Sequence, residues 1–172
     1  MQRFLRWLSR AGVLALGAAA LLTARPVEAQ PAYGSYIGVG IGVGQRNNDG
    51  DALDLAGLAA FRYKFLELPI SLRSQLLVDD GSIAFVPTVS YDIPLSWQVE
   101  PYIGVGASFA QEGSIIGDET AFVIQPGIDY AIPNSRIVIF GNAMIAIDAY
   151  NDSGPRDGDT AVSVQTGVGY RF

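Results

Sequence analysis

The side chains of this chain that could do chemistry are carboxylates, hydroxyls and basic groups, because the sequence contains neither histidine nor cysteine. Without histidine, the usual Ser-His arrangement that activates a nucleophile cannot be assembled. Without cysteine, disulfides and thiol chemistry are excluded as well. A carboxylate or hydroxyl acting alone is the remaining enzymatic alternative, which we disfavour. The sequence therefore predicts a protein that is not an enzyme and that has no cofactor.

Carboxylates in the polar segments of the chain are candidate ligands for Ca²⁺ or Mg²⁺, since both ions prefer oxygen donors. None of these carboxylates has the spacing of an EF-hand loop, and acidic residues in loops are more often simply solvated. We therefore predict no metal site. The carboxylates concerned are those of Asp49, Asp51, Glu112, Asp118, Glu119, Asp157 and Asp159.

A glycine at every second position from residue 38 to residue 44 is another pattern that could indicate a binding site. A dinucleotide-binding loop spaces its glycines as G-x-G-x-x-G at a turn from a strand to a helix. Here the glycines alternate with Ile37, Val39, Ile41 and Val43, and no amphipathic helix follows them. We interpret them as one face of a β-strand that carries no side chains.

Eight segments alternate apolar and polar residues with a period of two, which is typical of β-strands with two different faces. Polar segments separate them, and Asp80-Gly81 is a specific signal for a two-residue hairpin. Pro87, Pro101 and Pro126 lie inside strands and predict bulges, because proline cannot donate a ladder hydrogen bond. The predicted strands are residues 35–45, 54–65, 70–79, 82–93, 97–110, 120–132, 136–150 and 160–172.

The two faces of these strands differ in charge. The apolar face has no Asp, Glu, Lys or Arg, and its polar residues are Ser74 and Thr166. A soluble barrel that buries its apolar face would show the same alternation. However, an eight-stranded barrel is only wide enough for side chains to fill, and the large apolar residues of this face would overfill it. The sequence therefore predicts an all-β, eight-stranded antiparallel up-and-down transmembrane barrel, with the charged, glycine-rich face in its lumen.

Charged residues of the luminal face gather at one end of the predicted barrel, beside the short connections 66–69, 94–96 and 133–135. Charges in a lumen of low dielectric must pair or suffer a large desolvation penalty, so we predict an ion network that fills and closes the lumen. The alternative is that lumen water solvates each group separately, as in a narrow porin-like channel for ions or small solutes. The predicted network is Arg62, Lys64, Arg73, Asp92, Glu100, Asp129, Arg136 and Arg171.

Aromatic residues of the apolar face gather at the same end. In bacterial barrels, short turns face the periplasm, and aromatic residues form a girdle at each membrane interface. We therefore predict a periplasmic girdle. Its residues are Tyr63, Phe65, Tyr91, Trp97 and Tyr130.

The last strand keeps its apolar face to the final residue, with Val168, Tyr170 and Phe172 at alternate positions. This ending resembles the closing strand of bacterial outer-membrane β-barrels, in which a terminal Phe is part of the signal that the barrel assembly machinery reads. Residues 30–172 resemble the small outer-membrane barrel superfamily that includes the membrane domain of OmpA, OmpX and the opacity-type proteins. Enzymatic members of this architecture, the lipid A deacylase and the palmitoyl transferase, rely on a histidine that is missing here.

The resemblance implies an integral protein of the Gram-negative outer membrane, with outer-membrane lipid and the assembly machinery as partners. Beyond residue 29, acidic residues outnumber basic ones by more than two to one, so nucleic acid is not a predicted partner. The predicted function is a structural or surface-interaction role for a barrel with a mostly side-chain-filled polar lumen. A narrow channel is the alternative.

Residues 1–29 have the features of a secretory signal peptide: a basic start, an apolar run over residues 11–24, and small side chains at Val27 and Ala29. An apolar run of about 14 residues is short for the roughly 20 that a membrane-spanning helix needs. We therefore expect cleavage after Ala29, so that the protein in the cell envelope begins at Gln30. Amino-terminal sequencing of envelope material checks this, and recovery of the uncleaved start would contradict it.

Overall fold

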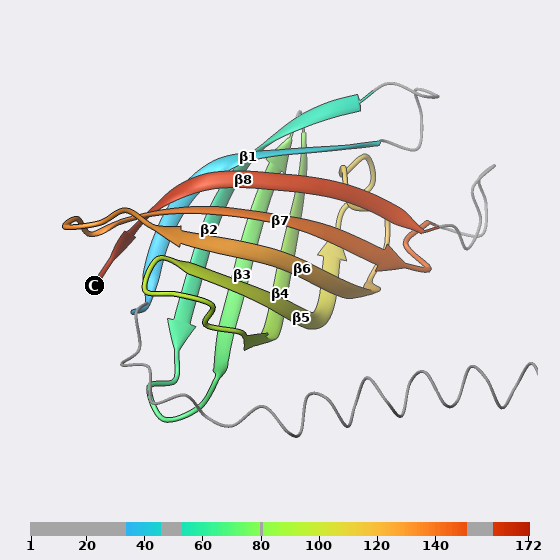
Figure 1. Ribbon diagram of the computed structural model, residues 1–172. Helices are drawn as coiled ribbons and strands as arrows, with labels where there is room; N and C mark the ends of the chain where they lie inside the picture. The colour runs from blue at the N-terminus through green and yellow to red at the C-terminus, as the bar shows by residue number, and fades with distance from the viewer. Residues whose placement is uncertain (1–33, 46–52, 80, 151–159) are drawn as a thin grey trace, which may run out of the picture. The chain divides into compact units, whose positions relative to one another are not determined.

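The chain forms a closed antiparallel β-barrel in the computed structural model (Figure 1). The structure describes residues 34–45, 53–79, 81–150 and 160–172, so the predicted signal peptide lies outside the described residues. The strands are β1 (Tyr36–Gln45), β2 (Leu53–Lys64), β3 (Ile70–Asp79), β4 (Ser82–Asp92), β5 (Val99–Ala110), β6 (Ala121–Ala131), β7 (Ile137–Ile147) and β8 (Ala161–Arg171). Each strand pairs with the next, and β8 pairs with β1, which confirms the predicted eight-stranded up-and-down fold. Within the described ranges, no helix is long and apolar enough to cross a membrane.

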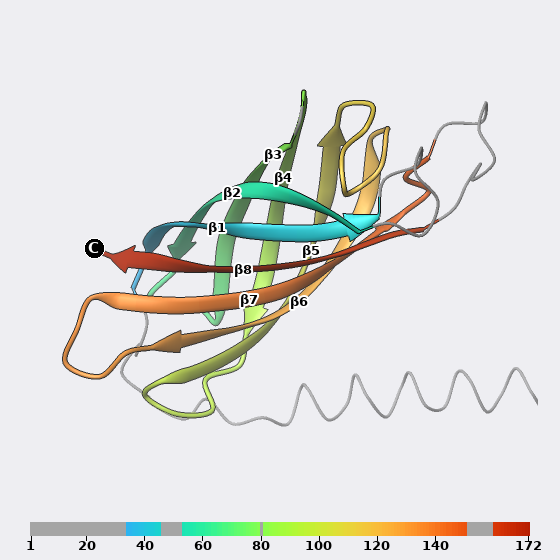
Figure 2. The same ribbon diagram turned by 90° about the horizontal axis from the view of Figure 1, so that it is seen from above.

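The two ends of the barrel differ in their connections. The turn end carries the short connections 65–69, 93–98 and 132–136, and the carboxy-terminus lies there as well (Figures 1 and 2). The opposite end, which we call the loop end, includes residues 111–120 between β5 and β6. The pairing of the last residue of β3 with the first of β4 leaves two residues between them, and φ is 93° at Gly81. This confirms the predicted two-residue hairpin.

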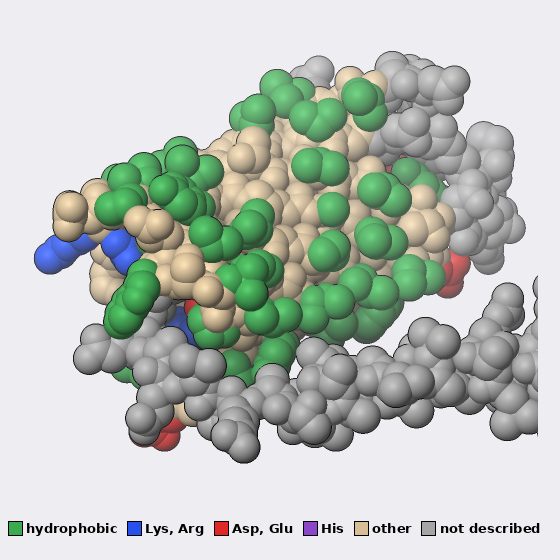
Figure 3. Space-filling view, viewed as in Figure 1, with side chains coloured by type: hydrophobic (Ala, Val, Ile, Leu, Met, Phe, Trp, Pro, Cys, Tyr) green, Lys and Arg blue, Asp and Glu red, His purple; other side chains and the backbone are tan. Residues whose placement is uncertain are grey.

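The apolar face of the strands points outward, as predicted. Val39 on β1 is 69% exposed, and Ile103 and Val168 are about half exposed. Figure 3 shows hydrophobic side chains spread over the outer surface on the side in view, with charged side chains only toward its ends. The alternate residues, such as Arg62 and Gln125, are buried inside the barrel. A soluble barrel would have the opposite sidedness, because its apolar face would form the core.

Two strand ends differ from the prediction by more than one residue. β5 begins later than expected, at Val99, because the N–H of that residue donates to Ser96 Oγ at 3.1 Å and closes a turn. β7 ends earlier than expected, at Ile147, because Asp148 has a φ of 61°, outside the range of an extended strand. In both cases a local turn interrupts an alternation that continues in the sequence.

The bulges predicted at Pro87, Pro101 and Pro126 do not form. The pairs on both sides of Pro87 belong to one unshifted register between β4 and β5, and the same holds for Pro126 between β6 and β7. Pro101 lies opposite Ile128 in a regular ladder. The φ angle of proline is compatible with an extended strand, so each proline removes a donor without displacing its neighbours.

Luminal glycines make room for aromatic rings from neighbouring strands. The rings of Tyr36 and Phe140 stack with 5.7 Å between their centroids, and a side chain at Gly38 would lie 2.8 Å from the Phe140 ring. The ring of Tyr102 lies against Gly127, its partner across the β5–β6 ladder. The predicted glycine-rich luminal face is therefore present, and aromatic side chains occupy the space that it leaves.

We expect Gly40→Ala to destabilise the barrel and Gly57→Ala to leave it intact. A Cβ at Gly40 would overlap the backbone oxygen of Thr166 and lie 2.7 Å from Gly167 Cα, where the backbone cannot easily move aside. At Gly57, which faces outward, the nearest atom is Val78 O at 3.6 Å. The expected loss is about 1–3 kcal/mol for the first variant and no loss for the second. Urea unfolding in detergent micelles measures both, and equal free energies of unfolding would contradict the predicted close contact.

Candidate functional site in the barrel lumen

Six ionisable side chains meet in the lumen near the turn end, and we call them the ionic cluster. They lie near the turn-end termini of five consecutive strands, and the period of two turns each of them inward. All are buried, and the equal numbers of cations and anions make the cluster neutral. The cations are Arg62 and Lys64 on β2 and Arg73 on β3; the anions are Asp92 on β4, Glu100 on β5 and Asp129 on β6.

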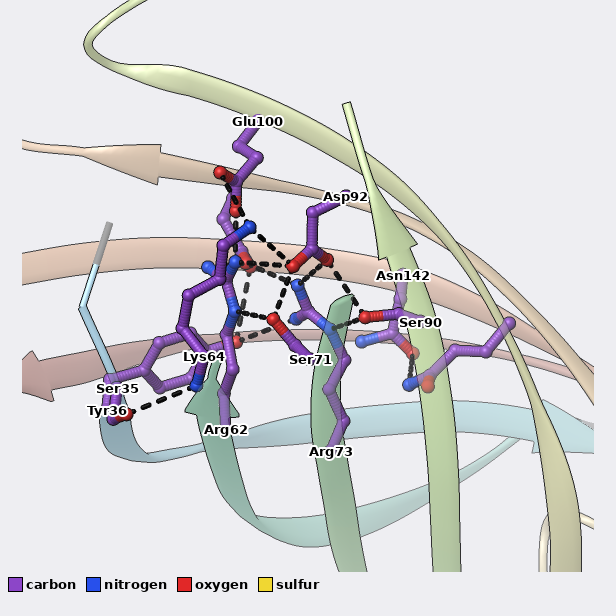
Figure 4. Close-up of polar contacts among 12 residues, drawn as sticks. Ser35, Tyr36, Arg62, Lys64, Ser71, Arg73, Ser90, Asp92, Glu100 and Asn142 are labelled. Atoms are coloured by element: carbon purple, nitrogen blue, oxygen red, sulfur yellow. Dashed lines mark hydrogen bonds and ion pairs between the residues drawn. The ribbon is translucent and has the colours of Figure 1, made fainter. Parts of the chain in front are cut away.

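Arg62 is the centre of the ionic cluster (Figure 4). Its guanidinium donates to Asp129 Oδ2 at 2.9 Å and to Asp92 Oδ2 at 3.0 Å, and it also pairs with Glu100. A guanidinium presents five donors in one plane, so a single arginine can bind carboxylates from several directions. Arg62 thereby links β2 to three other strands, β4, β5 and β6.

Lys64 and Arg73 complete the pairing. Lys64 Nζ lies 2.7 Å from Asp92 Oδ2 and 3.3 Å from Glu100 Oε2. Arg73 Nη2 lies 3.2 Å from Asp92 Oδ1 and 2.9 Å from Asp129 Oδ2. Each carboxylate of the cluster therefore contacts at least two cations, and each cation contacts at least two carboxylates.

Hydroxyl groups and an aromatic ring surround the ionic cluster. Ser71 and Ser90 each accept a hydrogen bond from an arginine Nε and donate to Asp92.

Two tyrosines also contact the ionic cluster. The hydroxyl of Tyr36 donates to Asp129 Oδ1 at 3.2 Å. The Tyr102 ring centroid lies 3.4 Å from the guanidinium carbon of Arg73, in a cation–π contact. These groups satisfy lone pairs and protons that the ion pairs leave, which a buried ion pair requires.

The structure places the other two predicted network residues at the rim of the turn end. Arg136 precedes β7 and is exposed, so its predicted inward position is wrong; its Nη1 donates to the Tyr170 hydroxyl at 3.2 Å. Arg171, the last residue of β8, is half-buried and donates to the backbone oxygen of Ser135. Strand alternation fixes the direction of a side chain only inside the strand. Both arginines lie at strand ends, where the chain enters or leaves a turn.

A layer of hydrogen-bonded amides and hydroxyls follows the ionic cluster toward the loop end. The inward residue Thr88 on β4 donates to Gln125 Oε1 at 2.6 Å. Gln125 Nε2 in turn donates to Asn142 Oδ1 at 3.1 Å, which joins β4, β6 and β7. The next inward residue of β4 toward the loop end is Val86, which is buried among apolar side chains. The layer thus separates a charged section of the lumen from an apolar one.

Apolar side chains make up most of the loop-end section, so the buried charges of the predicted polar lumen are found only toward the turn end. The sequence carries a signal of this change, because the inward positions of β2 pass from Lys64 and Arg62 to Leu58 and Ala56. The prediction of a polar lumen rests on the charged inward positions near the turn end and does not take this change into account. The buried apolar residues of this section include Leu58, Leu77, Val86, Ile115, Ile116, Val123 and Met144.

The residues predicted for the outer surface at the turn end are all exposed. Trp97 lies in the connection between β4 and β5, and the terminal Phe172 is bonded through its N–H to Ser35 O at 3.1 Å. The exposed aromatic residues predicted as the girdle are Tyr63, Phe65, Tyr91, Trp97 and Tyr130, and those of the terminal pattern are Tyr170 and Phe172, together with Val168.

Three of the carboxylates considered as metal ligands lie in the described part of the chain: those of Glu112, Asp118 and Glu119. Within that part, no group of three or more His, Cys, Asp or Glu residues is arranged to hold a metal ion. Asp118 Oδ1 instead accepts a hydrogen bond from the N–H of Gly113 at 2.9 Å. This carboxylate therefore shapes its own loop.

No protein-family model and no curated protein matches this sequence. Solved barrels do match its fold. Neisserial surface protein A has a TM-score of 0.57 at 13% identity, over 80% of this chain and 97% of that one. The crystal structure of Ail, the attachment invasion locus protein of Yersinia pestis, has a TM-score of 0.53 at 17% identity, over 81% of this chain and 99% of that one. A de novo designed transmembrane β-barrel has a TM-score of 0.51 at 13% identity, over 80% of this chain and 95% of that one.

Ail is also described as an outer membrane protein in a phospholipid bilayer nanodisc. At these identities the likeness establishes the fold. The chain therefore has the fold of the small eight-stranded outer-membrane β-barrels, as the resemblance in its sequence implied.

We expect Glu100→Ala to cost about 3–5 kcal/mol of unfolding free energy, because it leaves the buried cluster with three cations and two anions and therefore with an uncompensated charge. Urea unfolding in micelles measures this loss. Glu112→Ala removes the same side chain from an exposed loop position, and a surface change of this kind is expected to stay within about 0.5 kcal/mol. Equal losses in the two variants would contradict a paired cluster.

Removing both partners of one pair tests the same cluster by a second route. Lys64→Met with Glu100→Gln keeps the cluster neutral, because one cation and one anion are removed together. We expect the double variant to be more stable than the sum of the two single losses implies, by a coupling energy of about 0.5–3 kcal/mol. Additive losses in the unfolding measurement would show that the two side chains do not interact.

Proposed function

We propose that this protein is an integral outer-membrane β-barrel with a closed lumen and a structural or surface-interaction role in the cell envelope. The observation that carries the proposal is the filling of the lumen. The buried, neutral ionic cluster occupies the turn end, and apolar side chains occupy the loop end. A barrel with a filled lumen serves as a membrane anchor for its connections. It offers solutes no path through the lumen.

The outer surface supports the membrane part of the proposal. Apolar residues cover the strands and exposed aromatic residues gather at the turn end, as in barrels whose outer band contacts lipid. In the orientation that we propose, the turn end faces the periplasm. Phe172, with the alternate apolar residues before it, would serve as the signal to the barrel assembly machinery.

The charge of the connections argues for a surface chemistry different from that of one structural neighbour. Ail is described in complex with the heparin analogue sucrose octasulfate, which is a polyanion. In this chain, the segments 46–53, 111–119 and 151–159 carry many more acidic than basic residues. We propose that these connections do not bind sulfated polysaccharides, because like charges repel.

The test of the proposed function is single-channel recording on the protein reconstituted in a planar bilayer. We expect no steady conductance, because charged and apolar side chains occupy the lumen. Fractionation of the producing cells should recover the protein with the outer membrane. A steady wild-type conductance would overturn the closed barrel in favour of a narrow channel, and recovery in a soluble fraction would overturn the membrane location.

A further inference from the structure

The loop between β5 and β6, residues 111–120, turns back toward the barrel (Figure 2). At its tip, Ile115 and Ile116 are each 0% exposed, and the neighbouring Ser114 is buried as well. The residues near the ends of the loop, such as Glu112 and Glu119, are exposed. The loop therefore places its apolar part inside the lumen and leaves its charged part in solvent.

The tip of this loop reaches the opposite wall of the lumen. A side chain at Gly42 would lie 3.1 Å from Ile115 Cδ1, and one at Gly44 would lie 3.1 Å from Ile115 Cβ, so the isoleucine packs directly on β1. In the closed order of eight strands, β1 lies diametrically opposite β5, from which the loop starts. The loop consequently spans the full width of the lumen, in the space that the β1 glycines leave.

The loop tip joins the apolar section of the lumen. Leu77 on β3 approaches the same glycine, since a side chain at Gly42 would lie 3.0 Å from Leu77 Cδ2. Ile115 and Ile116 belong to one buried cluster with Val123 and Met144, which face inward from β6 and β7. The loop and the strands therefore both contribute apolar side chains to this section of the lumen.

Turn chemistry fixes the loop in this position. The N–H groups of Asp118 and Glu119 donate to Ala149 O, just beyond the end of β7, at 2.8 and 3.3 Å. The φ angles of Gly113 and Gly117 are 85° and 114°, in a region that side chains rarely permit. A Cβ at Gly117 would also lie 2.6 Å from Ala149 Cβ. The two glycines and the contact with Ala149 thus direct the tip inward.

We propose that the β5–β6 loop is a built-in plug that closes the loop end of the lumen independently of the ionic cluster at the turn end. The two closures rest on different physics. The ionic cluster excludes water through paired charges, whereas the plug excludes it through apolar packing. Loss of one closure leaves the other in place, so an open path through the barrel requires the loss of both.

The absence of cysteine from the chain allows a clean test of the plug. Met144→Cys puts one thiol in the buried loop-end section, and a charged, water-soluble methanethiosulfonate reports its accessibility in the protein purified in micelles. We expect the thiol to be protected behind the native loop. Adding Ile115→Ser and Ile116→Ser should raise its reaction rate by at least about tenfold, because the apolar tip no longer stays inside.

Glu112→Ser with Glu119→Ser is the matched control, since it makes two substitutions at exposed positions of the same loop and should leave the thiol protected. A thiol that reacts behind the native loop, or that stays protected after the isoleucine substitutions, would overturn the plug. Circular dichroism confirms that each variant retains the barrel. If the serine pair does not fold, Ile115→Ala with Ile116→Ala replaces it, with a smaller increase expected and an unchanged rate again contradicting the proposal.

A second thiol tests the independence of the two closures. Val138 is buried in β7 near the turn end. The thiol that Val138→Cys introduces there should stay protected from the methanethiosulfonate when the loop isoleucines are replaced. Reaction at this position in the loop variant would show that the plug also maintains the turn-end closure, and would overturn their independence. These readouts concern access to the lumen alone, so they stand apart from the membrane location and the conductance that test the proposed function.

Discussion

The interior of an eight-stranded barrel has room only for side chains, and this limit governs the rest of the structure. Most large apolar residues point outward, where they suit lipid, and the lumen receives glycines, charges and a limited set of apolar and aromatic side chains. Closure of the sheet between β1 and β8 pairs the backbone groups of both edge strands, as a hydrocarbon environment requires. Because the charges then lie in a narrow, water-poor space, their pairing becomes a condition of folding.

The lumen meets this condition by dividing its contents along its length. At the turn end, Arg62 binds three carboxylates from three strands, so one side chain joins much of the barrel wall. Hydrogen bonds among Thr88, Gln125 and Asn142 occupy the middle. At the loop end, packing replaces electrostatics, and Ile115 from the β5–β6 loop completes an apolar section that the strands alone leave unfinished.

Strands, sidedness and the core of the ionic cluster could be predicted because each depends on alternation within a strand. Alternation turns Arg62 and Asp92 inward. Both residues lie near the turn-end termini of their strands, which places them at about the same height along the barrel axis. Arg136 lies outside β7, where alternation no longer applies, so its direction was set by a contact with Tyr170 instead. The inward path of the loop depends on contacts with Ala149 and with the glycines of β1. These residues are distant in sequence from the loop, so no local pattern within the loop indicates its path.

The most direct test of a lipid-facing apolar surface around a closed lumen is an NMR measurement of nuclear Overhauser contacts to lipid chains and to water, made on β7 of the unmodified protein in nanodiscs. We expect the outward Ile139 and Ile145 to contact lipid chains. The inward Val138 and Met144, both 0% exposed, should contact neither lipid nor water. Water contacts at the two inward residues would contradict a closed lumen, and lipid contacts there would contradict the sidedness of the barrel.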